Sequence, residues 1–234
     1  MAKSEGEKRA VYAKMLELKD YFVDKSVWII GGDGWAYDFG YSGLDHVVSQ
    51  NRNVNILVLD TEVYSNTGGQ ATKSTPIGAE ALFAASGMRM TKKNLGFMCM
   101  SYGNVYVASI AMGANRQQTL TAIREAEAHN GPSIIIAYAP CMLHGINMAK
   151  SQVEQKRAVE AGYWPLYRYN PGAEKPFVWE TREPVAAYQE FIRSENRYKQ
   201  LLKAAPTEAE ALFTEAEADA KRRMEFYKKI GEVM

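Results

Sequence analysis

Short apolar runs alternate along the chain with longer polar or glycine-rich segments. The runs at 26–30, 54–59 and 133–139 are rich in β-branched residues, and each is followed by a loop of polar residues or glycines. Such runs are typical of strands in a parallel sheet, where both faces are buried. The run 133–139 (SIIIAYA) is apolar on both faces, and we therefore expect it to be a central strand.

Segments with helical spacing lie between these runs. The pattern predicts helices over 4–23, 38–49, 78–86, 95–102, 115–129 and 150–161. In the 115–129 helix, Leu120, Ile123 and Ala126 are expected on one packed side. The rhythm of strand, loop, helix and strand predicts an α/β fold, a doubly wound and mainly parallel sheet with right-handed crossovers.

Two further segments complete the expected sheet, and the composition then changes. The segment 105–111 is compatible with strand or helix, and 164–169 is expected to be an edge strand. Four residues then mark an irregular linker, namely Pro171, Gly172, Pro176 and Pro184. We expect an α/β domain over 1–170, and a linker with a C-terminal helical arm over 171–234.

The arm is rich in Ala, Glu, Lys and Arg. From 185 onwards it predicts two helices separated at Pro206. Thr207 and Glu210 have the spacing of a capping box for the second helix. The simplest interpretation of the arm is packing on this domain or on a neighbouring subunit.

Composition excludes several classes of protein. The 234 residues are 47% hydrophobic, and 28 Lys and Arg against 27 Asp and Glu give a net charge of +1, unlike a nucleic-acid-binding protein. No apolar run approaches the roughly 18 residues of a membrane span, and the N-terminus lacks a signal-peptide core. Cys99 and Cys141 are too few for a disulfide scaffold. A soluble, cytoplasmic protein without nucleic-acid or membrane partners is expected.

Two loops carry the candidate chemistry. Gly31-Gly32-Asp33-Gly34 follows the first apolar run, and the loop 60–77 follows the second. The 28 positions between Asp33 and Thr61 fit one strand–helix–strand unit. Both residues are therefore expected at the carboxyl ends of two strands, where open α/β sheets bind ligands. A loop as long as 60–77 inside a compact domain is usually functional or disordered, and the flanking apolar segments favour function.

The oxygen donors in these loops suit magnesium and a diphosphate. Mg²⁺ takes oxygen ligands in octahedral geometry and usually keeps phosphate oxygens and water among them. The Asp33 carboxylate, the Thr61 hydroxyl and the Val63 carbonyl meet that requirement. Gly31 and Gly32 would let backbone N–H groups approach a phosphate. The competing dinucleotide and Walker fingerprints are absent, because no third glycine follows in phase and no Gly-Lys-Ser/Thr occurs.

Four segments carry a family resemblance: GGDGWAYDFGYSGLDHV, VLDTEVYSNTGGQATKSTP, YVASIAMGANRQQ and SIIIAYAPCMLHGI. They closely resemble the C-terminal thiamine-diphosphate-binding domain of pyruvate:ferredoxin (flavodoxin) oxidoreductase, from about Lys19 to beyond Tyr169. The resemblance implies the thiamine-diphosphate-binding fold with Mg²⁺. It also implies oxidative decarboxylation of pyruvate to acetyl-CoA with coenzyme A, and electron transfer through [4Fe–4S] clusters to ferredoxin or flavodoxin.

The resemblance also assigns roles to individual residues. Asp33, Thr61 and Val63 fall on the magnesium ligands, and the catalytic asparagine falls on Asn66. Gly32, Gly34 and Trp35 complete the cofactor-binding set. Thr61 departs from the commoner thiamine-enzyme pattern, which has asparagine there, and this favours the oxidoreductase branch.

Cys141 falls on the fourth ligand of the [4Fe–4S] cluster nearest the thiamine, whose other three ligands lie upstream of the domain. Cys99 matches no motif and is expected in the core. His46, His129 and His144 do not share metal-ligand spacing, and Lys92-Lys93 is expected to be a solvated turn.

The resemblance covers the C-terminal portion of a much longer polypeptide. The chain alone is therefore expected to be catalytically incomplete, and to need the remaining domains of the same enzyme, with a homodimer implied by resemblance. Two alternatives stay open. One is the equivalent portion of an oxidoreductase for another 2-oxo acid, and the other is a non-catalytic module that retains the fold.

Overall fold

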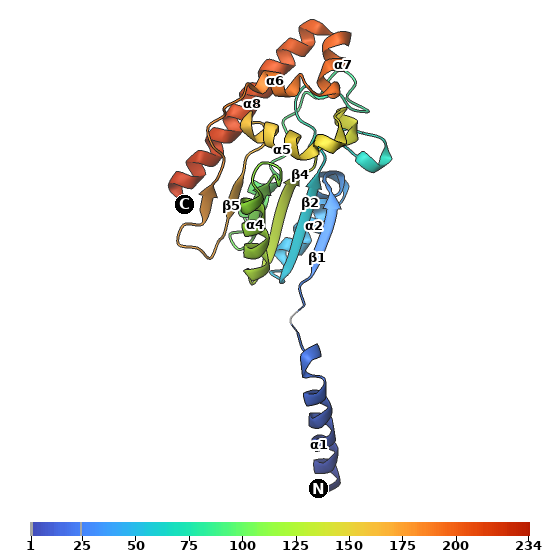
Figure 1. Cartoon of the computed structure of the whole chain (residues 1–234), viewed down its shortest axis with the longest axis vertical. Coiled ribbons are helices and arrows are strands. Elements are labelled where there is room, and N and C mark those ends of the chain that lie inside the picture. The colour runs from blue at the N-terminus through green and yellow to red at the C-terminus, as the bar shows by residue number, and fades with distance from the viewer. Residues whose placement is uncertain (1, 24) are drawn as a thin grey trace.

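The computed structural model of the chain describes residues 2–23 and 25–234, and within them the strands form one six-stranded sheet in the order β1-β2-β4-β3-β5-β6 (Figure 1). Four strands are parallel: β1 Trp28–Gly32, β2 Val54–Asp60, β3 Tyr106–Ile110 and β4 Pro132–Tyr138. Two short strands extend the sheet antiparallel, β5 Tyr167–Tyr169 and β6 Phe177–Trp179. The expected α/β fold with a mainly parallel sheet is confirmed.

The α-helices of the described residues are α1 Ala2–Glu17, α2 Tyr41–Ser49, α3 Leu95–Met100, α4 Arg116–Ala128, α5 Ser151–Glu160, α6 Tyr188–Ile192, α7 Asn196–Ala204 and α8 Pro206–Val233. The helices expected at 95–102, 115–129 and 150–161 are therefore confirmed. No helix in this described part of the chain is long and apolar enough to cross a lipid bilayer.

The strand β4 is central, as its sequence predicts, because it pairs with both β2 and β3. Side chains alternate between the two faces of the sheet. One face carries Ile134 and Ile136 into the main core, which α2, α3 and the C-terminal helices help to form. The other face carries Ile135 and Ala108, which pack beneath α4.

The packed side of α4 differs in part from the prediction. Ala126 is fully buried against the sheet together with Ala122, but Leu120 and Ile123 are 48% and 38% exposed. Small alanine side chains let the helix approach the strands closely, so the helix is rotated towards them.

The helix expected over 78–86 is absent. Gly78 and Phe83 adopt left-handed backbone angles, with φ of +79° and +68°, which no right-handed helix can contain. The backbone of this segment instead bonds to residues outside it: the Leu82 N–H donates to the Gly69 carbonyl over 2.9 Å, and the Glu80 N–H to the carbonyl of Arg197 on α7 over 3.0 Å. The apolar pattern of this segment thus reflects tertiary packing.

The ambiguous segment 105–111 is strand β3, which is buried along its whole length between β4 and β5. β5 is not the expected edge strand. β6 lies in the segment expected to be a linker and pairs with the outer side of β5.

The C-terminal helices pack into the main core. Tyr198, Leu201 and Phe213 are buried in the same cluster as Ile134. Figure 1 shows α8 running beside the short strands at one edge of the sheet. Pro206 begins α8, but the expected capping box is wrong. The N-cap is Ala205, without a side-chain bond, and Glu210 pairs with Arg193.

Candidate functional site

A cavity of about 460 Å³ opens at the carboxyl ends of β1 and β2. Its lining includes all seven residues that the sequence assigns to a cofactor, namely Gly32, Asp33, Gly34, Trp35, Thr61, Val63 and Asn66. The two loops therefore meet at one edge of the sheet, as expected from their spacing in an open α/β fold.

The chain leaves β1 through a π-helical turn over Gly34–Phe39, ahead of the helix start expected at 38. The Gly40 N–H donates to the Trp35 carbonyl over 2.9 Å, five positions back. Turns of this kind are rare and recur at functional sites. The turn folds the Trp35 ring over Gly31, where a Cβ would lie only 2.6 Å from the ring. Gly31 thus makes room for Trp35, and Gly32 is left facing open space.

Two neighbouring glycines of the cavity respond differently to a methyl group. A Cβ at Gly34 would lie 2.3 Å from Cε1 of Tyr64, whereas nothing lies within 4 Å of one at Gly32. Gly34→Ala is expected to displace the Tyr64 ring and to destabilise the chain by about 1–3 kcal/mol. Gly32→Ala should change the free energy of unfolding by less than about 0.5 kcal/mol. Urea titration of both variants tests this, and equal destabilisation would contradict it.

Three oxygen atoms that could act as metal ligands belong to residues lining the cavity. The Thr61 Oγ1 lies 2.8 Å from Asp33 Oδ1 and 3.0 Å from the Val63 carbonyl oxygen. A hydroxyl has one proton and can donate to only one of these acceptors at a time. Metal–oxygen bonds of about 2.1 Å place neighbouring ligands of an octahedron about 3.0 Å apart. The two distances from the Thr61 Oγ1 to its neighbours match that edge length.

Asp33 carries an insufficiently compensated charge. Its side chain is buried, its Oδ2 accepts a hydrogen bond from the Thr72 hydroxyl over 3.0 Å, and its Oδ1 accepts from Thr61. Burial and then the nearby negative charge of Asp60 raise the pKa of Asp33 to about 7 in spite of these hydrogen bonds and of Lys92. A bound cation would supply the missing charge. The sequence alone does not single out Thr72, because nothing local distinguishes it from its polar neighbours.

No cluster of three or more His, Cys, Asp or Glu side chains within residues 2–23 and 25–234 could hold a metal ion. The Asp33 donors form a different kind of set, with one carboxylate and two neutral oxygens. Such a set suits a hard cation that takes its remaining ligands from phosphate and water.

Cys141 lies beside the cavity wall. It is a free, buried cysteine, and its Sγ is 3.0 Å from the hydroxyl of Ser65, which lines the cavity. The Leu143 N–H also points to the sulfur, at 3.5 Å. Cys99 is buried in the core, where burial and then Asp45 raise its pKa to about 12, and so it behaves as a packing residue.

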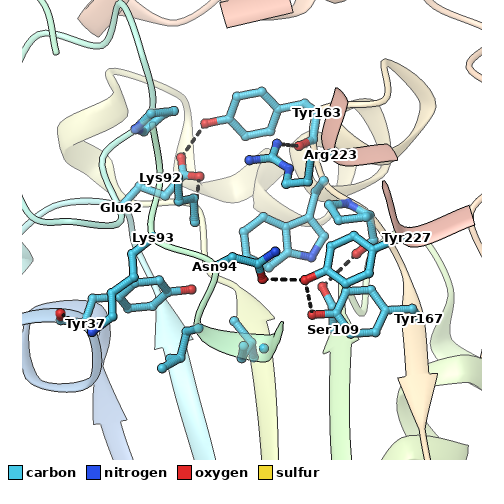
Figure 2. Close-up of a pocket in the computed structure, with 16 residues that line it drawn as sticks. Tyr37, Glu62, Lys92, Lys93, Asn94, Ser109, Tyr163, Tyr167, Arg223 and Tyr227 are labelled. Atoms are coloured by element: carbon cyan, nitrogen blue, oxygen red, sulfur yellow. Dashed lines mark hydrogen bonds and ion pairs between the residues drawn. The ribbon is translucent and has the colours of Figure 1, made fainter. Parts of the chain in front are cut away.

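The loop that carries Thr61 and Val63 turns at Glu62, whose φ of +59° is left-handed. Such a conformation costs a non-glycine residue about 1–3 kcal/mol and needs surrounding contacts to maintain it. The buried Glu62 carboxylate accepts bonds from Lys92, Arg197 and Tyr163, over 3.0, 2.8 and 2.5 Å, and Figure 2 shows the Tyr163 contact beside Lys92.

These partners overturn one expectation from the sequence. Lys92 is not part of a solvated turn: its side chain is 10% exposed, and its Nζ also lies 2.8 Å from Asp60. Burial would raise the pKa of Glu62, but the charges of Lys92 and Arg197 outweigh it and lower this pKa to about 2. Glu62 is therefore ionised and paired at neutral pH. Its partners lie far away in the sequence, and no local pattern identified them.

Comparison with known proteins indicates a cofactor-binding domain, in agreement with the cavity at the ends of β1 and β2. Residues 10–137 match the family model described as thiamine pyrophosphate enzyme, C-terminal TPP binding domain. The chain is 57% identical over 236 residues to pyruvate:ferredoxin oxidoreductase of Moorella thermoacetica, covering 99% of this chain and 20% of that protein. It is 56% identical over 219 residues to pyruvate-flavodoxin oxidoreductase of Klebsiella pneumoniae, covering 91% of this chain and 19% of that protein.

Among solved structures, the chain is similar to the 2-oxoglutarate:ferredoxin oxidoreductase from Magnetococcus marinus, with 24% identity, a TM-score of 0.47, and coverage of 50% of this chain and 40% of that one. The chain spans about a fifth of the length of the curated relatives it matches. The family model and the two curated relatives confirm the resemblance drawn from the four motifs. Since the family model covers more than half of the sequence, the chain belongs to the family of C-terminal TPP-binding domains of thiamine pyrophosphate enzymes.

Proposed function

We propose that this chain is the thiamine-diphosphate- and magnesium-binding portion of a pyruvate:ferredoxin or pyruvate:flavodoxin oxidoreductase. The observation that carries the proposal is the meeting of the Asp33, Thr61 and Val63 oxygens at the carboxyl ends of β1 and β2. The names and high identities of the relatives from Moorella and Klebsiella support pyruvate as the 2-oxo acid and ferredoxin or flavodoxin as electron carrier. Coenzyme A is proposed as the acyl acceptor on the family resemblance of the four motifs alone.

The residues that line the cavity could bind both the Mg²⁺ ion and the phosphates of the cofactor. Asp33, Thr61 and Val63 would hold Mg²⁺, which neutralises the diphosphate. Gly32 and Gly34 would let the backbone approach the phosphates, and Trp35 would form one wall. Asn66, further along the lining, is the proposed catalytic residue. When bound, thiamine diphosphate supplies the electron sink for decarboxylation of a 2-oxo acid, and the protein supplies orientation and charge.

Cys141 is proposed as one ligand of a [4Fe–4S] cluster. The sulfur is free of disulfide bonding, and both the Ser65 hydroxyl and the Leu143 N–H can donate to a thiolate there. A cubane cluster needs four protein ligands, so three others must come from outside this chain. With a fifth of the relatives' length, the chain is proposed to be catalytically incomplete alone, and to act with the remaining domains of the enzyme, as a homodimer.

The test of the proposed site is the metal dependence of cofactor binding. Calorimetric titration of the 234-residue chain with thiamine diphosphate should give an affinity at least about tenfold higher with excess Mg²⁺ than with EDTA, a difference of about 1.4 kcal/mol. Thiamine itself, which has no diphosphate for the metal to bridge, is the control and should show no metal dependence. Equal affinity for thiamine diphosphate with Mg²⁺ and with EDTA would contradict the proposal.

A further inference from the structure

Arg197, on α7 of the C-terminal arm, is buried against the loop that carries the proposed metal ligands. Its guanidinium joins two buried carboxylates: Nη2 lies 2.8 Å from Glu62 Oε2, and Nε lies 2.6 Å from Glu195 Oε2. Nη2 also lies 3.1 Å from the Tyr163 hydroxyl. The forked shape of the guanidinium allows both carboxylates to be held at once, which a lysine ammonium cannot reproduce with the same geometry.

A second connection runs from Arg197 to the other side of the same loop. The Glu195 carboxylate lies 3.6 Å from Nδ1 of the buried His144, and the His144 Nε2 lies 2.8 Å from the Thr61 carbonyl oxygen. A carbonyl oxygen can only accept, so Nε2 carries the hydrogen. Arg197 therefore reaches Glu62 directly and Thr61 through Glu195 and His144.

The backbone between these two attachments is the left-handed turn at Glu62. Thr75 donates to the Glu62 carbonyl over 2.6 Å, and the Glu62 N–H donates to Asp60 over 3.1 Å. The turn brings the Val63 carbonyl back to within 3.0 Å of the Thr61 hydroxyl. A residue with a Cβ leaves this conformation readily when its contacts are removed, whereas glycine adopts it without strain.

We propose that Arg197 is a positioning residue for this site, which holds Glu62 in its left-handed turn so that the Thr61 hydroxyl and the Val63 carbonyl face Asp33. The inference rests on the proposed function only for its effect on the cofactor. Its structural part concerns the loop itself. In this proposal the C-terminal arm supports a site whose residues lie more than 130 positions earlier in the chain.

The structural part is tested by amide hydrogen exchange on the metal-free 234-residue chain. Arg197→Lys keeps a positive charge but cannot bridge both carboxylates. It should speed exchange in a peptide covering 60–66 by at least about tenfold, and leave peptides from the central strand β4 unchanged. Unchanged exchange in 60–66, or equally faster exchange in β4, would overturn the proposal.

A pair of charge-matched double variants separates positioning from general stability. Arg197→Met with Glu62→Gly and Arg197→Met with Glu62→Ala both remove one positive and one negative charge, and they differ only by a Cβ at the left-handed position. The glycine pair should bind thiamine diphosphate with Mg²⁺ at least about fivefold more tightly than the alanine pair. Equal affinities of the two pairs would overturn the proposal.

The two proposals fail in different ways. If the unmodified chain shows no metal-dependent cofactor binding, the proposed function fails. The exchange difference in 60–66 still decides whether Arg197 holds the loop. If the unmodified chain binds the cofactor and Arg197→Lys leaves both exchange and affinity unchanged, only the positioning role is lost.

Discussion

Replacing Asp33 with asparagine is expected to abolish magnesium-dependent binding of thiamine diphosphate and, at the same time, to stabilise the metal-free chain. The carboxylate is the only negative group among the three proposed metal ligands. Its loss should weaken cofactor binding in the presence of Mg²⁺ by more than about 100-fold, beyond the cost of altering a group that only supports a ligand. The variant should then bind the cofactor equally well with Mg²⁺ and with EDTA.

The opposite effect on stability follows from burial of the charge. Burial and Asp60 raise the pKa of Asp33 from 3.8 to about 7, so the folded chain holds this proton at a higher pH than the unfolded chain does. The contribution of Asp33 to the stability of the metal-free chain therefore falls as the pH rises from about 4 to about 7, and the loss is complete above that range. At about 1.4 kcal/mol for each pKa unit, the cost approaches roughly 4 kcal/mol, of which asparagine should recover about 1–3 kcal/mol.

The amide of asparagine fits the existing hydrogen bonds. Its oxygen can accept from Thr61, and its nitrogen can donate to the Thr72 hydroxyl, which now donates to Asp33. Urea unfolding in EDTA at about pH 4 and about pH 8 measures the effect. The gain over the unmodified chain should be larger at the higher pH. A variant that is less stable than the unmodified chain at both pH values would contradict this account of the site.

The candidate site was predictable because its chemistry is local. A buried strand, a glycine-rich turn and an oxygen donor can each be recognised from a few consecutive residues. The 28 positions between Asp33 and Thr61 predict one strand–helix–strand unit between the two loops. Parallel pairing then brings both loops to the same edge, whatever the details of the helix between them. The structure accordingly places the whole predicted lining in one cavity.

The groups that support this site could not be predicted in the same way. Lys92 lies in a polar segment whose pattern predicts a solvated turn. Arg197 lies on a helix that has the composition of an ordinary charged arm. Each is buried and paired with a carboxylate far away in the chain. Charge pairing of this kind depends on tertiary packing, and composition and periodicity do not encode it.

Apolar periodicity failed where small residues or special backbone angles decide the packing. In α4 the alanines face the sheet, whereas the larger Leu120 and Ile123, which were expected on the same side as Ala126, face outwards. In 78–86 the alanines suggest a helix, but left-handed Gly78 and Phe83 exclude one. Propensity is a weak guide when tertiary contacts satisfy the backbone elsewhere.

Replacing Phe213 with alanine is expected to be among the most destabilising single changes in the C-terminal arm. The side chain is fully buried, packs edge-on against Tyr198 with ring centroids 5.6 Å apart, and lies 3.1 Å from where a Cβ at Gly78 would be. Loss of a buried phenyl group costs about 3–5 kcal/mol. Because this ring belongs to the same core as the sheet, thermal unfolding followed by circular dichroism should remain one transition at a lower temperature.

Phe226 provides the matched control, because it lies on the same helix and undergoes the same substitution. Its ring is 38% exposed and meets Phe97 at the surface, so Phe226→Ala should cost only about 1 kcal/mol. Two separate transitions for Phe213→Ala would mean that the arm and the sheet fold independently, and similar losses for the two variants would contradict the core position of Phe213. A single transition with a large loss at Phe213 alone would mean that α8 is part of the core beneath the site. Damage to the arm should then reach the loop at Glu62 through Arg197, although neither α7 nor α8 lines the cavity.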